Sequence, residues 1–206
     1  MSESLESHVK ASIPVLCLFI LTGCNQQVPF QTPSVGDTVE VTQETKSHST
    51  RSVEIEIANL YAGIVMAIHQ NPEHNAIDSY GRGMAWKKIP ENMHEMLNAK
   101  HGYFGKVSNR KVMLLSDGSN DIFSIATGES FDPEEFKESL SGFFRLTSRE
   151  SDASMGQKMD LYQLNDGDRE IGVLSIIYGT ADSIQGAATV SFVSNDRARK
   201  EGILIR

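Results

Sequence analysis

Cysteine is scarce in this chain. Its two cysteines, Cys17 and Cys24, lie near the N-terminus, and residues 25–206 contain none. That part of the chain therefore has no cysteine nucleophile, no thiolate ligand for zinc and no disulfide. A domain without free thiols suits a compartment outside the cytosol, where an unpaired thiol is a liability.

Positive charge is also in short supply. The 206 residues include 27 Asp and Glu against 19 Lys and Arg, which gives a formal net charge of -8 at pH 7. The Lys and Arg residues form no cluster, whereas binding to nucleic acid or to anionic lipid depends on a basic patch. The sequence therefore predicts no nucleic-acid partner, and it leaves membrane attachment to a covalent lipid.

The apolar run Ile13–Leu21 is far shorter than the roughly 20 residues that a membrane-spanning helix needs. Its length is typical of the apolar core of a secretory signal, which has about 7–15 residues before a cleavage site with small residues. The run ends in Leu21-Thr22-Gly23-Cys24, so the small residues and a cysteine follow at once.

This ending resembles the lipobox of the bacterial lipoprotein signal peptide: Leu, a small residue, Gly or Ala, then Cys. The resemblance implies cleavage between Gly23 and Cys24, with Cys24 carrying diacylglycerol and a further acyl chain such as palmitate. Two or more chains give stable anchoring, at about 0.8 kcal/mol per buried methylene. Asn25, where an Asp would direct the protein to the inner membrane, implies the outer membrane, with the protein facing the periplasm.

Residues 1–10 depart from this resemblance, because a signal peptide should begin with a basic segment. They contain Glu3 and Glu6 but only one cation, Lys10. We hypothesise that translation starts at Val9, read from an alternative start codon, rather than at Met1. The intact mass of an uncleaved precursor distinguishes the two, since a mass that includes residues 2–8 would exclude the later start.

The sequence divides into three parts. Residues 1–23 form the signal peptide. Residues 24–51 form the lipidated N-terminus and a flexible tether, rich in Gln, Thr, Ser, Pro and Val, whose reach is about 30 Å. Residues 52–206 are long enough for one globular domain with its own core.

Apolar residues in this domain recur first at helical spacing and then with a period of two. Ser52, Pro90 and Asp132-Pro133 are typical helix starts. The helix that starts at Asp132-Pro133 is expected to bury the stripe Phe136, Leu140, Phe143 and Phe144. The predicted helices are Ser52–His69, a short piece within 73–88, Pro90–His101 and a helix from Asp132 to about Gly142.

Between and after these helices, alternating segments predict strands, and Asn165-Asp166-Gly167-Asp168 predicts a hairpin turn. This order predicts the α+β class: two or three helices packed on antiparallel sheet, in one compact domain after the tether. The predicted strands are Tyr103–Ser108, Lys111–Leu115, Asp121–Thr127, Arg145–Arg149, Lys158–Leu164, Glu170–Tyr178, Ala188–Ser194 and a short one at Gly202–Arg206.

Candidate metal ligands gather in the helical third of the domain. His94 and His101 lie near Met93 and Met96 in the sequence, and imidazole with thioether suits copper outside the cytosol. Their spacing matches no closed metal motif, and a core stripe with surface histidines explains it as well. The sequence therefore predicts no metal and no cofactor.

Four aromatic residues, Tyr61, Trp86, Tyr103 and Phe104, are candidates for an apolar groove that binds a peptide, lipid or glycan. The alternative is that they belong to the core. No Gly-x-Ser-x-Gly context and no phosphate-binding glycine loop is present. The favoured function is a membrane-anchored envelope lipoprotein with a non-catalytic binding or assembly domain and an unknown envelope partner. A small periplasmic enzyme and a periplasmic metal-binding protein remain the alternatives.

Overall fold

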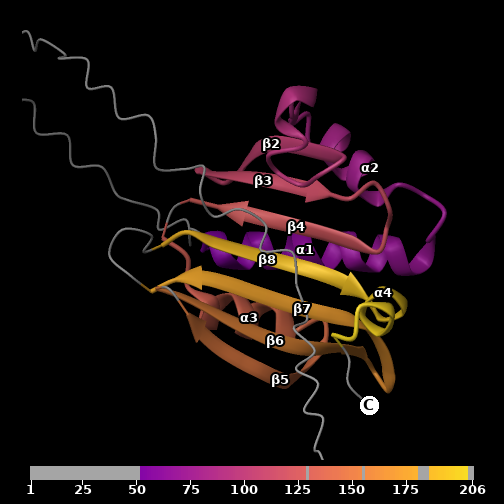
Figure 1. The fold of residues 1–206 in the computed structure, drawn as a ribbon, viewed down its shortest axis with the longest axis vertical. Helices are drawn as coiled ribbons and strands as arrows, with labels where there is room; N and C mark the ends of the chain where they lie inside the picture. The colour runs from indigo at the N-terminus through magenta and orange to yellow at the C-terminus, as the bar shows by residue number, and fades with distance from the viewer. Residues whose placement is uncertain (1–51, 129, 155, 181–185, 204–206) are drawn as a thin grey trace, which may run out of the picture.

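The computed structural model describes residues 52–128, 130–154, 156–180 and 186–203 (Figure 1). The predicted signal peptide, Cys24 and the predicted tether lie outside these residues. Helices and strands combine in one unit, which confirms the predicted α+β class. Within the described residues, no helix combines the length and the apolar character needed to cross a membrane.

One antiparallel sheet of eight strands organises the domain. Its order is β1-β2-β3-β4-β8-β7-β6-β5, so two meanders meet where β4 and β8 pair. The strands are β1 Lys87–Lys88, β2 His101–Val107, β3 Arg110–Ser116, β4 Ile122–Thr127, β5 Arg145–Ser154, β6 Gln157–Asp166, β7 Arg169–Gly179 and β8 Ala188–Ser194.

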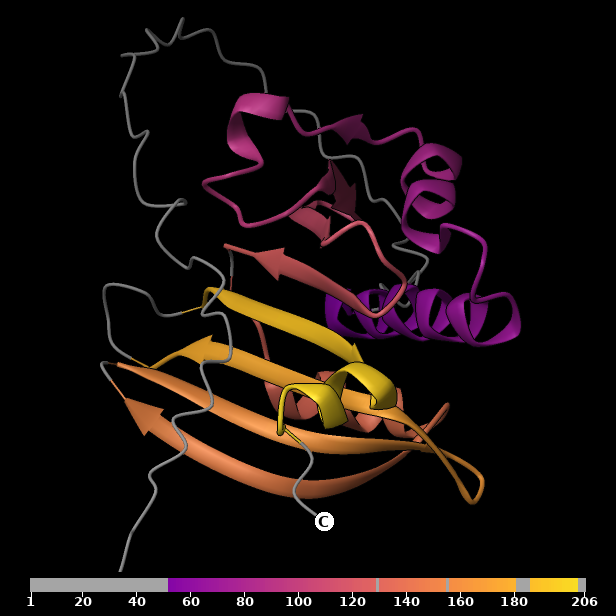
Figure 2. The same cartoon turned by 45° about the vertical axis from the view of Figure 1, so that its right-hand side comes forward.

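Two helices, α1 (Val53–Gln70) and α3 (Pro133–Ser141), cover one face of this sheet, which we call the helix face (Figures 1 and 2). The Ser52 side chain caps α1 by accepting a hydrogen bond from the Ile55 N–H at 3.3 Å. Asp132 caps α3 in the same way, with Pro133 in its first turn. The apolar stripes of both helices pack on the sheet and form the main core.

Alternation along each strand sends the remaining apolar residues to the other face, which we call the second face. Two separate covers lie on it. The segment 89–99 packs Ile89, Leu97 and Ala99 on Met113 and Leu115. At the other end, helix α4 (Asn195–Lys200) packs Ala198 on Leu161 and Val173. Helix α4 also overlies one end of β7 and β8, and only the strip of sheet between it and the segment 89–99 has no helix above it among the described residues.

The predicted helix Pro90–His101 is wrong. Only Glu91–Met93 forms a short 3-10 helix (η1), turns follow, and Asn98 has a positive φ of 48°. Strand β2 begins at His101, two residues earlier than expected. The turns let Leu97 and Ala99 reach the sheet together, so tertiary packing overrides the helical signal of Pro90.

The C-terminal region and α3 also differ from expectation. Helix α4 (Asn195–Lys200) forms in a segment for which no element was predicted. The strand predicted at Gly202–Arg206 lies largely outside the described residues, because 204–206 are not among them. Gly202 (φ +71°) ends α4 in a Schellman motif, because the Ile203 N–H donates to the Ala198 carbonyl at 2.9 Å. Phe143 is 45% exposed, so it does not belong to the buried stripe of α3.

Candidate functional site

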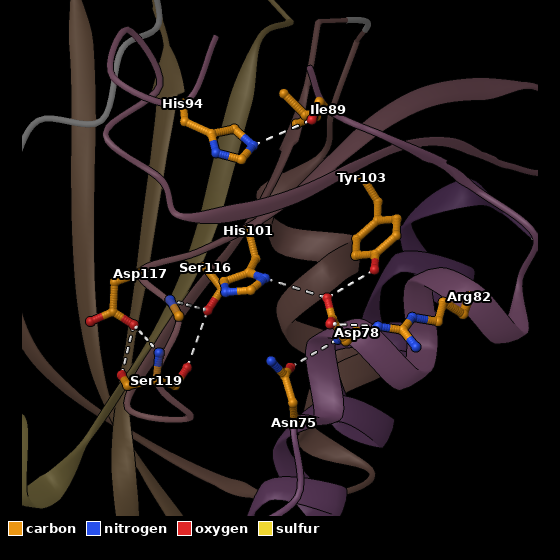
Figure 3. A network of polar contacts seen from close by, with 11 residues as sticks. Asn75, Asp78, Arg82, Ile89, His94, His101, Tyr103, Ser116, Asp117 and Ser119 are labelled. Carbon is orange, nitrogen blue, oxygen red and sulfur yellow. Dashed lines mark hydrogen bonds and ion pairs between the residues drawn. The ribbon is translucent and has the colours of Figure 1, made fainter. Parts of the chain in front are cut away.

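A polar network joins helix α2 (Ala76–Gly83) to β2 at one end of the sheet (Figure 3). Asp78 is at its centre. One carboxylate oxygen accepts a hydrogen bond from the Tyr103 hydroxyl at 2.8 Å and lies 3.6 Å from His101 Nδ1. The other oxygen accepts from Arg82 Nη2 at 3.0 Å. Asn75 positions Asp78 by capping α2, since its side chain accepts from the Asp78 N–H at 2.9 Å.

Opposing effects set the charge of this network. Burial alone would raise the pKa of the Asp78 carboxyl, but the Tyr103 hydrogen bond and the charges of His101 and Arg82 outweigh it. The pKa of Asp78 therefore lies below its ordinary value. Burial and the hydrogen bond to Asp78 raise the pKa of Tyr103, so the phenol stays protonated and donates. All of these contacts are between protein groups, which indicates that the network fixes α2 against the sheet.

Substitution of Asp78 by Asn is expected to lower the free energy of unfolding by about 1.5–3 kcal/mol at pH 7, the size of a lost hydrogen bond to a charged group. The folded pKa is the lower one, so this stabilisation is complete above the unfolded pKa of about 3.9 and disappears as pH falls through the folded pKa. Urea unfolding of both proteins at pH 7 and pH 3 measures this convergence. Glu73→Gln, at an exposed carboxylate nearby, is the control. A gap between wild type and Asp78→Asn that stays constant with pH would contradict the assignment.

The loop after β3 is held in a turn by hydrogen bonds between neighbouring residues. Asp117 Oδ1 accepts hydrogen bonds from the Ser119 N–H at 2.9 Å and the Ser119 hydroxyl at 2.6 Å. Ser116 Oγ accepts from the Gly118 N–H at 3.1 Å, and Gly118 has a positive φ of 88°. These local bonds account for Asp117 as a turn residue. Asn120 has a different role, because its side-chain amide donates to the Pro72 and His74 carbonyls, each at 2.6 Å, and ties the loop to the segment after α1.

A cavity of about 750 Å³ lies between the end of α1, this loop and the start of α4. It is lined by groups of both charges, among them Asp121, Arg169 and Glu170. Asp121 accepts a hydrogen bond from the Ser194 hydroxyl at 2.6 Å, and Arg199 lies 3.9 Å from Glu170. Because the lining combines cations and anions, the cavity has no clear preference for one kind of ligand.

A second cavity, of about 380 Å³, lies on the second face between the two covers, and we call it the serine groove. Its floor is formed by Ser124 of β4, Thr189 and Ser191 of β8, and Ser175 of β7. One wall is formed by residues 98–100 and the other by α4 and Ile203. The groove thus occupies the part of the sheet that neither cover protects.

The structure does not bring the four aromatic candidates together. Tyr61 and Tyr103 are buried in the core of the helix face, at 0% and 3% exposure. Trp86 packs against that core and lies over Gly105. Phe104 points to the second face and lines a separate hollow there. They therefore form no common groove, and the cavities are lined largely by other residues.

The metal-ligand candidates also diverge. His94 Nε2 lies 3.3 Å from the Ile89 carbonyl, whereas His101 faces Asp78 (Figure 3). Met93 packs beside Ile89, and Met96 is 50% exposed. Across the described ranges, no group of three or more His, Cys, Asp or Glu side chains is placed to hold a metal ion.

Sequence reasoning missed Asp78 and the serines of the groove floor. Asp78 lay in a segment expected to be partly loop, and its partner Tyr103 is 25 residues away in sequence. The serines become neighbours only through the pairing of β4, β8 and β7. No family model, curated protein or solved structure matches this chain.

Proposed function

We propose that this protein is a lipid-anchored protein of the bacterial cell envelope whose α+β domain is a non-catalytic binding module. The observation that carries the proposal is the motif Leu21-Thr22-Gly23-Cys24 directly after a short apolar run. Cleavage before Cys24 and acylation of this residue tie the domain to the membrane through residues 25–51. Asn25, at the position where an Asp would direct the protein to the inner membrane, supports an anchor in the outer membrane with the domain in the periplasm.

The geometry of the domain supports binding rather than chemistry. In the network around Asp78, the side chains of Asp78, Tyr103 and Arg82 are bonded to one another and fix α2 to the sheet. A second group, Asp160 with Lys158 and Tyr178, is likewise bonded internally. The second face, by contrast, is hollowed at the serine groove, which lies between the two covers that the described residues form there. A concave site with an apolar lining and a few polar groups is the usual form of a ligand site.

Labelling cells with a palmitate analogue tests the anchor. Wild-type protein should incorporate the label and sediment with membranes, because two or more acyl chains bind a bilayer stably. Cys24→Ala should lose the label by at least tenfold and leave the membrane fraction. Cys17→Ala is the matched control, since Cys17 lies in the removed peptide, and it should label like wild type. Label retained by Cys24→Ala, or absent from wild type, would refute the anchor.

A further inference from the structure

We propose that the serine groove binds a small neutral molecule with an apolar body and one hydrogen-bonding group. This inference rests on the proposed function only in treating the domain as a binding module, and it does not depend on the lipid anchor. It is carried by the floor of the groove, by its walls and by the charges at its rim.

Three serines on adjacent strands form a row across the floor. Ser124 of β4 is paired in register with Ser191 of β8, and Ser191 is paired with Ser175 of β7. Residues paired in register point to the same face of a sheet, so all three hydroxyls point to the second face. The Oγ atoms of Ser124 and Ser191 are 2.8 Å apart and share a hydrogen bond. The row therefore forms a polar strip on the floor, with Thr189 beside it.

Ser175 ends this row with its hydrogen-bonding capacity unused. The residue is 6% exposed, and its Oγ is buried without a hydrogen-bond partner among the described residues. It also lines the groove. A buried hydroxyl without a partner lowers stability, and an unsatisfied group in a native structure calls for an explanation. A ligand carbonyl or hydroxyl in the groove would provide the missing partner.

The walls fit an apolar body. Apolar side chains surround the serine row, and the volume of about 380 Å³ falls in the range of about 300–1,000 Å³ for small-molecule sites. Ile203 belongs to the wall because the Schellman motif at Gly202 turns the chain back onto Ala198. The apolar residues of the lining are Ala99, Leu115, Ile122, Ile177, Val193 and Ile203.

The charges at the rim favour a neutral ligand. Lys100 and Arg197 are balanced by Asp117 and Glu201. Arg197 Nε is 2.5 Å from a Glu201 carboxylate oxygen, so this cation is already paired. Asp117 accepts two hydrogen bonds from Ser119. With two charges of each sign and most of them engaged, the rim attracts neither an anion nor a cation strongly.

Benzyl alcohol and toluene form a matched pair of probes, because they share an apolar ring and differ in one hydroxyl. We would titrate each into the ¹⁵N-labelled full chain carrying Cys24→Ala, which removes the lipid anchor without touching a described residue. Benzyl alcohol should shift the amide resonances of Ser124, Ser175 and Ser191. Ser175→Ala should weaken benzyl alcohol binding by about three- to tenfold, the effect of one hydrogen bond, and leave toluene binding unchanged.

Two further variants complete the test. Ile177→Trp fills the groove and should weaken both probes at least tenfold, whereas Ser148→Ala, at an exposed position of β5 in the same sheet, should affect neither. Without ligand, Ser175→Ala should raise the urea midpoint, because it removes an unpaired buried hydroxyl. Three results would overturn the proposal: no benzyl alcohol binding, shifts confined to another region, or equal loss of both probes in Ser175→Ala. Because none of these results depends on acylation, a failure here is separable from a failure of the Cys24 labelling.

Discussion

Replacing Glu54 by Ala is expected to lower the free energy of unfolding by about 3–5 kcal/mol, the cost of removing one partner from a buried ion pair. Glu54 Oε1 lies 2.7 Å from Arg110 Nη1, and the two side chains are only 7% and 11% exposed. The same oxygen accepts the Asp132 N–H at 3.3 Å. One carboxylate thus joins the start of α1, the start of β3 and the cap of α3, and its loss leaves the Arg110 guanidinium buried without its charge partner.

Urea unfolding followed by circular dichroism measures this effect, and two variants make the test specific. Glu56→Ala removes a carboxylate two residues further along α1 that bonds the exposed Ser108 hydroxyl, and it should cost less than about 1 kcal/mol. Replacing Glu54 and Arg110 together by leucine should recover much of the lost stability, because no unpaired charge remains. If Glu54→Ala cost no more than Glu56→Ala, the pair would not be the structural link described.

The parts of the fold that the sequence predicts well are those set by neighbouring residues. Ser52 and Asp132-Pro133 are local helix starts, and the structure has a cap at each of them. Strand β8, Ala188–Ser194, has the predicted bounds, because apolar and polar residues alternate from Ala188 to Phe192. The Asn165–Asp168 turn is also local, and Gly167 takes the positive φ of 59° that such a turn needs.

The errors in the predicted secondary structure arise where contacts between residues far apart in the sequence determine the local structure. Pro90 is a typical first residue of a helix, yet the segment that follows has to place Leu97 and Ala99 on Met113 and Leu115, and a continuous helix does not form. Helix α4 is short and polar, so its sequence carries no strong helical period. It forms where Ala198 packs on β6 and β7 and Ser194 caps its start.

The candidate sites separate in the same way. The Leu21–Cys24 motif is contiguous, so the sequence alone is enough to predict the proposed anchor. The groove could not be predicted without the strand register, because the serines at positions 124, 175 and 191 are far apart in the sequence. Tyr103 and Phe104 show the opposite error: consecutive residues in a strand point to opposite faces, so the two aromatic side chains cannot line one surface.

Replacing Tyr61 by Ala is expected to destabilise the domain by about 3–5 kcal/mol, the usual cost of deleting a large buried aromatic side chain. Tyr61 is fully buried on α1, with its ring 5.2 Å from Phe123 of β4 and 6.0 Å from Phe136 of α3, measured between ring centroids. The Phe136 contact is edge-to-face, at 88°. The ring therefore connects both helices to the centre of the sheet, and its removal leaves a cavity there.

Tyr61→Phe separates the ring from the hydroxyl. Burial raises the pKa of Tyr61 well above its ordinary value, so the phenol stays protonated and donates to the Ser191 carbonyl at 3.2 Å. Phe keeps the ring contacts and loses this bond, so it should cost only about 0.5–1.5 kcal/mol in chemical unfolding. A Phe variant as unstable as Ala would mean that the hydroxyl, and not the ring, stabilises this part of the core. Because Ser191 also lies in the floor of the serine groove, the same bond links the core of the helix face to the backbone of the proposed ligand site.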